Sequence, residues 1–158
     1  MIQNLLPRRS FILAAALTLV MLPTSQALAE AITIDVAKTR GCGCCILWIE
    51  HLEQNGFTTT SEDMLPGMLI RHKLDSGVPQ KMISCHTGMV EGYVIEGHVP
   101  AADIRRLLSE RPDAIGLAVP GMPYGSPGMG PEDEREAYDV FLILKDGTTE
   151  IYSRYSGT

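Results

Sequence analysis

Apolar and polar residues follow two rhythms along this chain, and the rhythms divide it into strands and helices. The segment Ile32–Val36 alternates and is rich in β-branched residues, which is typical of a strand. The segment Cys45–Gln54 instead places Ile46, Ile49 and Leu52 at helical spacing. In chain order the two rhythms predict strands at 32–36, 57–64, 81–86 and 93–99 and helices at 45–54, 65–74 and 101–110.

Turn residues separate these elements and give the order βαβαββα. Asn55-Gly56 ends the first helix, Asp75-Ser76-Gly77 ends the second, and Pro100 begins the third. Cysteines at the start of the first helix, together with the step Val78-Pro79 before the third strand, are typical of a thioredoxin-like α/β fold. In such a fold helices cover a central sheet, and Pro79 is expected to be a cis-proline beside Cys42.

The composition changes in the last third of the chain. Residues 117–131 are rich in proline and glycine, which predicts a long loop that cannot form regular structure. The acidic segment Glu132–Glu136 is expected to be a solvated loop or a turn of helix. The chain then closes with a predicted β-hairpin, whose strands 138–144 and 149–155 flank Asp146-Gly147.

The first 29 residues have the pattern of a segment removed on export. Arg8-Arg9 precedes the apolar run Phe11–Leu22, and Ala27-Leu28-Ala29 offers a small-residue cleavage site, so a signal peptide is predicted at 1–29. An uncleaved anchor is the alternative, although the run is short for a bilayer span. The paired arginines also resemble a twin-arginine signal, which leaves the export route open. Residues 30–158 are then expected to form one thioredoxin-like metal-binding domain in the periplasm.

Charge and composition exclude several classes of function. The chain has 13 basic and 19 acidic residues, and only Arg8 and Arg9 precede Glu30, so the mature chain has a net charge of −8. This acidity argues against a nucleic-acid partner. A content of 45% hydrophobic residues argues against disorder. The chain has no H-E-x-x-H, Gly-rich phosphate loop or G-x-S-x-G motif, so hydrolytic and nucleotide chemistry have no support.

Three of the four cysteines lie within the five residues 41–45, at the turn from the first strand into the first helix. Backbone N–H groups and the helix dipole favour negative charge at this place, so thiols there should lose protons more readily. Cysteines so closely spaced cannot join distant parts of a fold, which points to metal ligation or catalysis. The predicted metal ligands are Cys42, Cys44, Cys45 and, from the strand 81–86, Cys85.

The identity of the metal follows from the arrangement of these thiols. Adjacent residues on a helix, such as Cys44 and Cys45, point about 100° apart, so four cysteines would close on one tetrahedral ion only with distortion. Thiolates that bridge several ions avoid this difficulty. Copper(I) is soft and accepts two or three sulfur ligands, so copper is the predicted metal and zinc is the alternative.

Four further side chains are candidates for the site. Met122 and Met129 bracket part of the Pro/Gly-rich loop, where thioether ligation and packing over the site are both open. His86 follows Cys85 on a predicted strand, so its side chain should face away from Cys85, which favours a supporting or surface role unless the strand ends there. His98 ends the next strand and can lean over the same edge.

Several motifs occur together in the order and spacing of a known family. They are Lys38-Thr39, Cys42-Gly43-Cys44-Cys45 with Trp48, Gly77-Val78-Pro79, Ser84-Cys85-His86-Thr87, the run 92–100, and the loop segments 120–123 and 126–129. Together they resemble the exported metal-binding family typified by the copper-resistance protein CopG, over about residues 32–155. The resemblance implies a thioredoxin-like periplasmic domain that serves copper resistance. It also implies a cysteine-bridged multicopper cluster held by Cys42, Cys44, Cys45 and Cys85.

Two other functions stay open beside copper binding. A thiol-disulfide oxidoreductase could use Cys42 and Cys45 as its redox pair, although Cys44 and Cys85 would then be unnecessary and would favour mispairing. A copper metallochaperone could deliver copper to an efflux or oxidase partner, and its acidic surface would meet a basic patch. Redox activity on copper is a further option. No membrane contact is expected once the signal peptide is cleaved.

Overall fold

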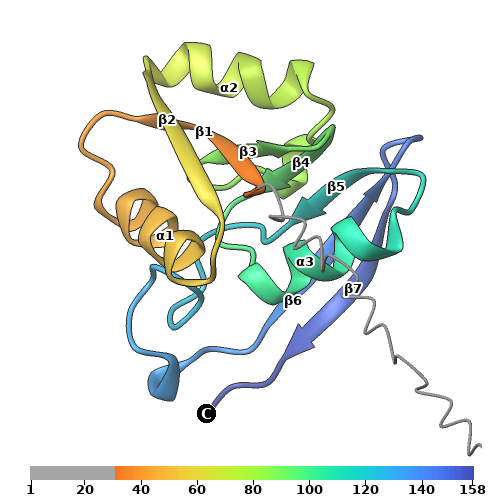
Figure 1. Cartoon of the computed structure of the whole chain (residues 1–158). Coiled ribbons are helices and arrows are strands. Elements are labelled where there is room, and N and C mark those ends of the chain that lie inside the picture. Colours follow the sequence, from red (N-terminus) through yellow and green to blue (C-terminus); the bar gives the residue numbers. More distant parts are fainter. Residues whose placement is uncertain (1–30) are drawn as a thin grey trace, which may run out of the picture.

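The computed structural model describes residues 31–158, and the predicted signal peptide lies outside the described residues. The described part is a mixed α/β structure with one seven-stranded sheet and three α-helices (Figure 1). Its elements are β1 (Thr33–Thr39), α1 (Gly43–Gln54), β2 (Thr58–Met64), α2 (Pro66–Asp75), the 3₁₀ helix η1 (Gln80–Met82), β3 (Thr87–Val90), β4 (Tyr93–Glu96), α3 (Ala101–Glu110), β5 (Ala114–Ala118), the 3₁₀ helix η2 (Glu132–Glu134), β6 (Tyr138–Leu144) and β7 (Thr149–Tyr155).

The sheet has the strand order β2-β1-β3-β4-β5-β6-β7. The pairs β1–β2 and β4–β5 are parallel because α1 and α3 cross over between them, and the other pairs are antiparallel. The predicted order βαβαββα is confirmed up to α3, as is the parallel pairing of the first two strands. The C-terminal hairpin is also confirmed, with both strands as predicted.

Both faces of the sheet carry hydrophobic side chains, because successive residues of β4 point to opposite sides. Ile95 belongs to the larger cluster, which includes Trp48 of α1 and the apolar side of α3. Val94 belongs to a smaller cluster on the other face. Helix α2 covers that second face, where its Lys73 contacts Glu96. Figure 1 accordingly shows strands lying between α2 and α1.

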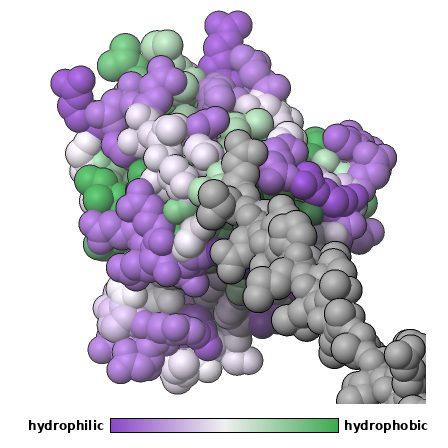
Figure 2. Space-filling view, viewed as in Figure 1, coloured by the Kyte–Doolittle hydropathy of each residue, from purple (hydrophilic) through white to green (hydrophobic). Residues whose placement is uncertain are grey.

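The surface in the view of Figure 2 is mostly hydrophilic and has separate hydrophobic patches. Exposed large apolar side chains occur on α1 and α2, among them Ile46, Leu47, Met68 and Ile70. No helix among residues 31–158 is long and apolar enough to cross a membrane.

The prediction of a strand at 81–86 is wrong. Residues 80–82 form η1, Cys85 lies in a bend, and β3 begins only at Thr87. The reason is that Ser84 is held by other contacts: its backbone N–H donates to the Glu96 carboxylate, and it forms only an isolated bridge with Gly121. The segment that carries Cys85 is therefore a fixed loop rather than a strand.

The prediction of a cis-proline is also wrong, since the described residues contain no cis peptide bond and the Val78–Pro79 bond is trans. After α2, Gly77 turns the chain with φ 87°, and Pro79 then precedes η1 instead of leading into a strand. Met82 donates its backbone N–H to the Pro79 carbonyl at 2.8 Å and closes this turn. Pro79 therefore starts a 3₁₀ turn, and Cys85 follows it six residues later in the chain.

Strand β5 was not predicted, and its last two residues fall in the segment expected to be irregular. Its sequence Ala-Ile-Gly-Leu-Ala has low strand propensity and stands next to proline-rich chain. The glycine in this strand is required, because a Cβ at position 116 would lie 1.8 Å from the carbonyl oxygen of Val94. Glycine thus permits the close approach of β5 to β4.

Candidate metal centre

The cysteine turn joins the end of β1 to the start of α1. Gly41 has φ 72°, which turns the chain, and Cys42 is the N-cap residue of the helix. The Cys42 carbonyl accepts the first helical hydrogen bond, from the Ile46 N–H at 3.2 Å. Cys44 and Cys45 therefore lie in the first turn of α1, where Cys45 is fully buried and Cys44 half-buried.

Cys85 reaches this turn from the loop between η1 and β3. The preceding residue, Ser84, donates its N–H to a Glu96 oxygen at 2.6 Å and its hydroxyl to the Gly121 carbonyl. Gly97 has φ 73°, and a Cβ there would lie 2.5 Å from the Ser84 hydroxyl, so glycine is needed for the loop to pack. These contacts fix the position of the Cys85 thiol.

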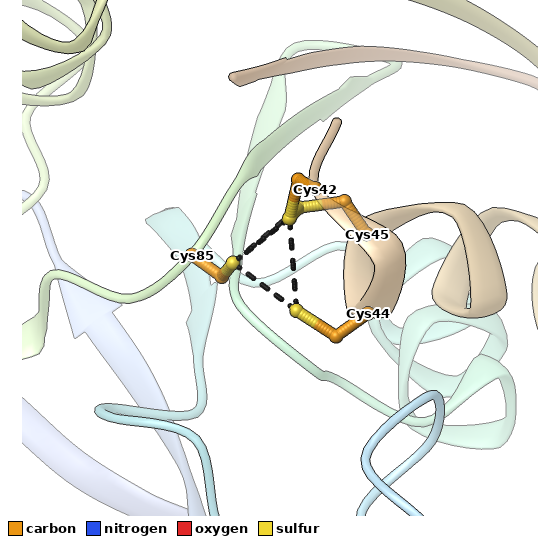
Figure 3. Close-up of side chains that lie close together, drawn as sticks. All are labelled: Cys42, Cys44, Cys45 and Cys85. Carbon is orange, nitrogen blue, oxygen red and sulfur yellow. Dashed lines mark hydrogen bonds between the residues drawn. A yellow bond between two sulfur atoms is a disulfide. The ribbon is translucent and has the colours of Figure 1, made fainter. Parts of the chain in front are cut away.

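The four cysteine sulfurs form a compact group, with Cys85 facing the other three across the turn (Figure 3). The Cys85 Sγ lies 3.2 Å from the Sγ of Cys42 and 3.3 Å from those of Cys44 and Cys45. All four sulfurs lie within 4.8 Å of one another. Cys42 and Cys45 are joined as a disulfide, whereas Cys44 and Cys85 are free thiols. The structure thus brings together all four cysteines predicted from the sequence.

The spacing of these sulfurs fits a thiolate metal site. Metal–sulfur bonds of about 2.3 Å separate tetrahedral ligands by about 3.8 Å, so the unbonded pairs at 3.2–3.6 Å need to move apart only slightly. Use of all four ligands also requires two-electron reduction of the Cys42–Cys45 bond. The expected divergence of Cys44 and Cys45 is not observed, because both sulfurs contact Cys85. The geometry therefore accommodates one ion as well as several.

A buried ion pair lies behind the Cys85 loop. The Lys73 ammonium donates to Glu96 at 2.7 Å and to the Thr87 hydroxyl at 2.9 Å, and that hydroxyl donates to the second Glu96 oxygen at 2.7 Å. The side chains of Lys73 and Glu96 are 1% and 0% exposed. Since Glu96 also accepts from Ser84, the network links α2, β3, β4 and the Cys85 loop.

Burial is also the main influence on the acidity of Cys85. It raises the pKa of this thiol to about 12, the adjacent Cys44 acts in the same direction, and the Lys73 ammonium opposes the shift. Burial in turn lowers the pKa of Lys73, whereas Glu96 raises it. In the metal-free, disulfide-bonded protein Cys85 is therefore a neutral thiol at neutral pH. A metal bound by its thiolate must displace a proton.

The two candidate histidines are buried close to Cys85. His86 precedes β3 and is not on a strand, so the expectation that it faces away from Cys85 does not apply. Donor atoms of Cys85, His86 and His98 lie within 4.8 Å of one another. Burial lowers the pKa of His98 and lowers that of His86 well below its ordinary value, so both imidazoles are neutral at neutral pH.

The Pro/Gly-rich loop packs on the start of α1. A Cβ at Gly128 would lie 2.7 Å from the Trp48 nitrogen and 2.8 Å from the Cys44 carbonyl oxygen, so loop and helix are in direct contact. Met129 is half-buried, and its N–H donates to the Ser126 carbonyl at 2.8 Å. Met122 is 56% exposed and so contributes little to covering the site. Ligation by either thioether stays a prediction.

The Lys73–Glu96 pair is the part of the site that sequence patterns did not indicate. One signal was present in each element. Lys73 follows Leu69 by four residues, and these two are the buried residues of α2. Glu96 ends the otherwise apolar strand β4. A charged residue on an apolar face suggests a buried partner, but only the folded chain shows which one.

The chain is similar to one protein family and to two solved structures. Residues 82–129, which include Cys85 and the loop, match the family described as "Protein of unknown function, DUF411". A solved structure titled "Copper resistance protein copG- Form 1" is 47% identical, with a TM-score of 0.75, and the match covers 81% of this chain and 100% of that chain. A second, titled "Copper resistance protein copG- Form 2", is 46% identical, with a TM-score of 0.73 and coverage of 80% and 99%. The search of curated proteins gives no match.

Proposed function

Because this chain belongs to the CopG family of copper-resistance proteins, we propose that it binds copper through Cys42, Cys44, Cys45 and Cys85 and contributes to copper tolerance. The observation that carries this proposal is the group of four sulfurs within 4.8 Å, held by a helix start on one side and an anchored loop on the other. Four thiolates are a soft donor set, which favours copper(I) over harder cations.

We propose further that the reduced protein holds more than one copper(I) ion. Cys85 is central to the group, since its sulfur contacts the other three, and a thiolate in this position can bridge two ions. The proposal includes export: the predicted signal peptide at 1–29 would place the protein in the periplasm. It also includes a thioredoxin-like arrangement of β1 to α3, which the observed order of elements supports.

Anaerobic titration tests the proposal. Reduced protein is titrated with copper(I) against a competing chelator, for the parent and for Cys85→Ser. We expect more than one copper per parent chain and the loss of several in the variant, because Cys85 contacts every other sulfur. Ser126→Ala is a control, since Ser126 is buried in the loop and its hydroxyl donates to the Pro123 carbonyl of the same loop. Unchanged capacity in Cys85→Ser would contradict the proposal.

The Cys42–Cys45 disulfide favours a second candidate, thiol-disulfide exchange. In this reaction an incoming thiolate attacks one sulfur of the bond, forms a mixed disulfide and releases the other sulfur as a thiolate. The test is the exchange rate with a small dithiol for the parent, Cys85→Ser and Cys42→Ser. An exchange enzyme should lose activity in Cys42→Ser and keep it in Cys85→Ser. Rapid exchange together with no copper binding would favour this function over the first.

A further inference from the structure

A cleft lies beside the metal centre, between α1 and the Pro/Gly-rich loop. It consists of two cavities of about 330 and 390 Å³, which meet at His51. The first cavity lies along α1, and the second continues to the start of α3 and the C-terminal hairpin. In Figure 1 the loop passes below α1. The residues that line this α1–loop cleft include Leu47, Glu50, His51, Gly128, Gly130 and Glu132.

One wall of the cleft touches the surroundings of the metal centre. A Cβ at Gly128 would lie 2.8 Å from the Cys44 carbonyl oxygen, so the loop is in contact with the turn that carries the cysteines. The preceding residue, Pro127, has its carbonyl oxygen 2.8 Å from the Nδ1 of His98. A molecule seated in the cleft would therefore lie directly behind the first turn of α1.

The α1–loop cleft is lined and edged by carboxylates. Glu50 on α1 and Glu132 on the loop line it, and both side chains are exposed. Three more exposed carboxylates lie close behind Glu132 in the sequence, at Asp133, Glu134 and Glu136. These five groups give the cleft an acidic rim.

Little positive charge offsets this rim. Helix α1 has no Lys or Arg, and neither cavity is lined by one. The only basic residue between 112 and 136 is Arg135, which is 15% exposed and paired with Glu132 at 2.8 Å. His51 is neutral, because its Nε2 accepts the Ala101 N–H and burial lowers its pKa. The cleft therefore attracts positively charged groups.

Apolar side chains stand next to these charges. Leu47 lines the cleft and is exposed, as is the neighbouring Ile46. Tyr124 is exposed on the loop, where its ring packs against Gly130. Lys and Arg side chains match such a surface, because their apolar stems cover hydrophobic groups while their charged ends reach carboxylates.

The spread of the carboxylates favours a polypeptide over a metal ion. Among residues 31–158, the groups of His, Cys, Asp and Glu donors that converge within 4.8 Å all contain Cys85, and none lies in this cleft. The acidic side chains are instead distributed from α1 to η2. A chain that carries several Lys or Arg residues can pair with them along its length.

From this charge complementarity we propose that the α1–loop cleft docks a basic, extended segment of a partner protein. The inference deepens the proposed function, because it names where a partner of the copper-binding protein would bind. Its relevance to copper rests on the proposed function, whereas docking itself depends only on the cleft. The acidic rim should also speed the encounter with a basic partner, most strongly at low ionic strength.

Peptide binding to the metal-free protein tests the cleft. The probe is a fluorescent peptide of alternating lysine and alanine, and a peptide with glutamate in place of lysine is its control. Only the lysine peptide should bind, as measured by fluorescence anisotropy. In the double variant Glu50→Gln with Glu132→Gln its affinity should fall by about fivefold or more, because two ion pairs are lost. The matched control is Glu62→Gln with Glu150→Gln, which removes the same charge from exposed positions on β2 and β7 and should change affinity by less than about twofold.

Amide NMR shifts locate the bound peptide. They should change most at Gly128, Gly130 and Glu132. Equal affinities in the two double variants would mean that net charge alone attracts the peptide, and would overturn the docking site. Shift changes confined to residues outside the cleft, or no binding at low ionic strength, would overturn it as well.

Copper counting on the same proteins separates this inference from the proposed function. The variant with Glu50→Gln and Glu132→Gln should bind as much copper as the parent, since neither residue belongs to the cysteine group. Cysteine-dependent copper without peptide binding would overturn the docking site and leave the proposed function. Peptide binding in the cleft without cysteine-dependent copper would overturn the proposed function and leave the docking site.

Discussion

At the residue scale, the contact that most constrains the cysteines is the ion pair between Lys73 and Glu96. Both side chains are almost completely buried, and the carboxylate also accepts the backbone N–H of Ser84, next to Cys85. Removal of one charge from such a pair leaves the other without compensation in a medium of low polarity. The pair should therefore matter both for stability and for the position of Cys85.

Glu96→Gln should lower the free energy of unfolding by about 3–5 kcal/mol, because it leaves the Lys73 ammonium buried without its counter-charge. Urea unfolding of the metal-free protein measures the effect. Glu110→Gln is the matched control: it removes one partner of the exposed Arg106–Glu110 pair and should cost less than about 1 kcal/mol. Similar losses in the two variants would mean that the buried pair does not hold the fold together.

The grouping of the cysteines could be predicted where the pattern was local. Cys42, Cys44 and Cys45 are neighbours in sequence, and Cys85 is the one other cysteine of the chain. The burial of His86 could not be predicted, since it depends on Trp48 and His98 from other elements. The salt bridge of Lys73 likewise joins residues 23 positions apart, which no local pattern reports.

At the element scale, the long loop is held on α1 by a glycine contact. Gly128 has φ 85°, and any Cβ there would meet the backbone of Trp48 and Cys44. Gly128→Ala should therefore displace the loop. It should lower the free energy of unfolding by about 1–3 kcal/mol more than a Gly→Ala change that adds only backbone strain. Gly147→Ala is that control, because Gly147 has φ 80° and a Cβ there would meet nothing within 4 Å. Denaturant unfolding of both variants measures the difference, and equal losses would show that the loop does not depend on this contact.

The C-terminal hairpin is tied to α3 by tyrosines, which predicts a pH dependence. The Tyr155 hydroxyl donates to Asp103 at 2.7 Å, and burial, reinforced by this bond, raises the pKa of Tyr155 above its ordinary value. The folded state then binds more protons than the unfolded state above about pH 10, so this stabilisation is complete below that pH and is lost as pH rises further.

Tyr155→Phe tests this dependence. Between pH 9 and 11 the free energy of unfolding of the parent should fall with rising pH. The slope for the variant should be shallower, by the equivalent of up to about one proton per molecule. Denaturant unfolding at a series of pH values gives the slopes. Tyr124→Phe is the comparison variant, since it also removes one tyrosine hydroxyl but from an exposed position on the loop. A slope in Tyr155→Phe equal to that of the parent would contradict the assignment.

Helices and strands could be predicted where the hydrophobic period and the turn residues indicated the same structure. The hairpin around Asp146-Gly147 was located to the residue because alternating strands and a tight turn point to the same structure. The strand predicted at 81–86 is wrong because this segment forms a loop. The loop is held by the Ser84 N–H, which donates to the Glu96 side chain. Strand β5 was missed because Gly116, which weakens a strand pattern, is needed for close approach to Val94.

At the scale of the whole molecule, copper binding and stability should be coupled. The four sulfurs come from two separate parts of the chain, and only the folded protein brings them together. Copper bound by this state alone should raise the apparent free energy of unfolding, by about 2.7 kcal/mol at a free concentration 100 times the dissociation constant. Thermal unfolding of the reduced protein with and without copper(I) measures the coupling. No stabilisation at saturating copper would argue against a centre that depends on the fold.

The most direct test of the copper centre is to count copper and reactive thiols in the protein isolated anaerobically from the periplasm of copper-exposed cells. The proposed function predicts more than one copper per chain, with Cys42, Cys44, Cys45 and Cys85 all protected from a thiol reagent. Chelation of the copper should then expose four reactive thiols, because a metal centre needs every cysteine in the reduced form. A metal-free protein with the Cys42–Cys45 disulfide and only two reactive thiols, at Cys44 and Cys85, would contradict it.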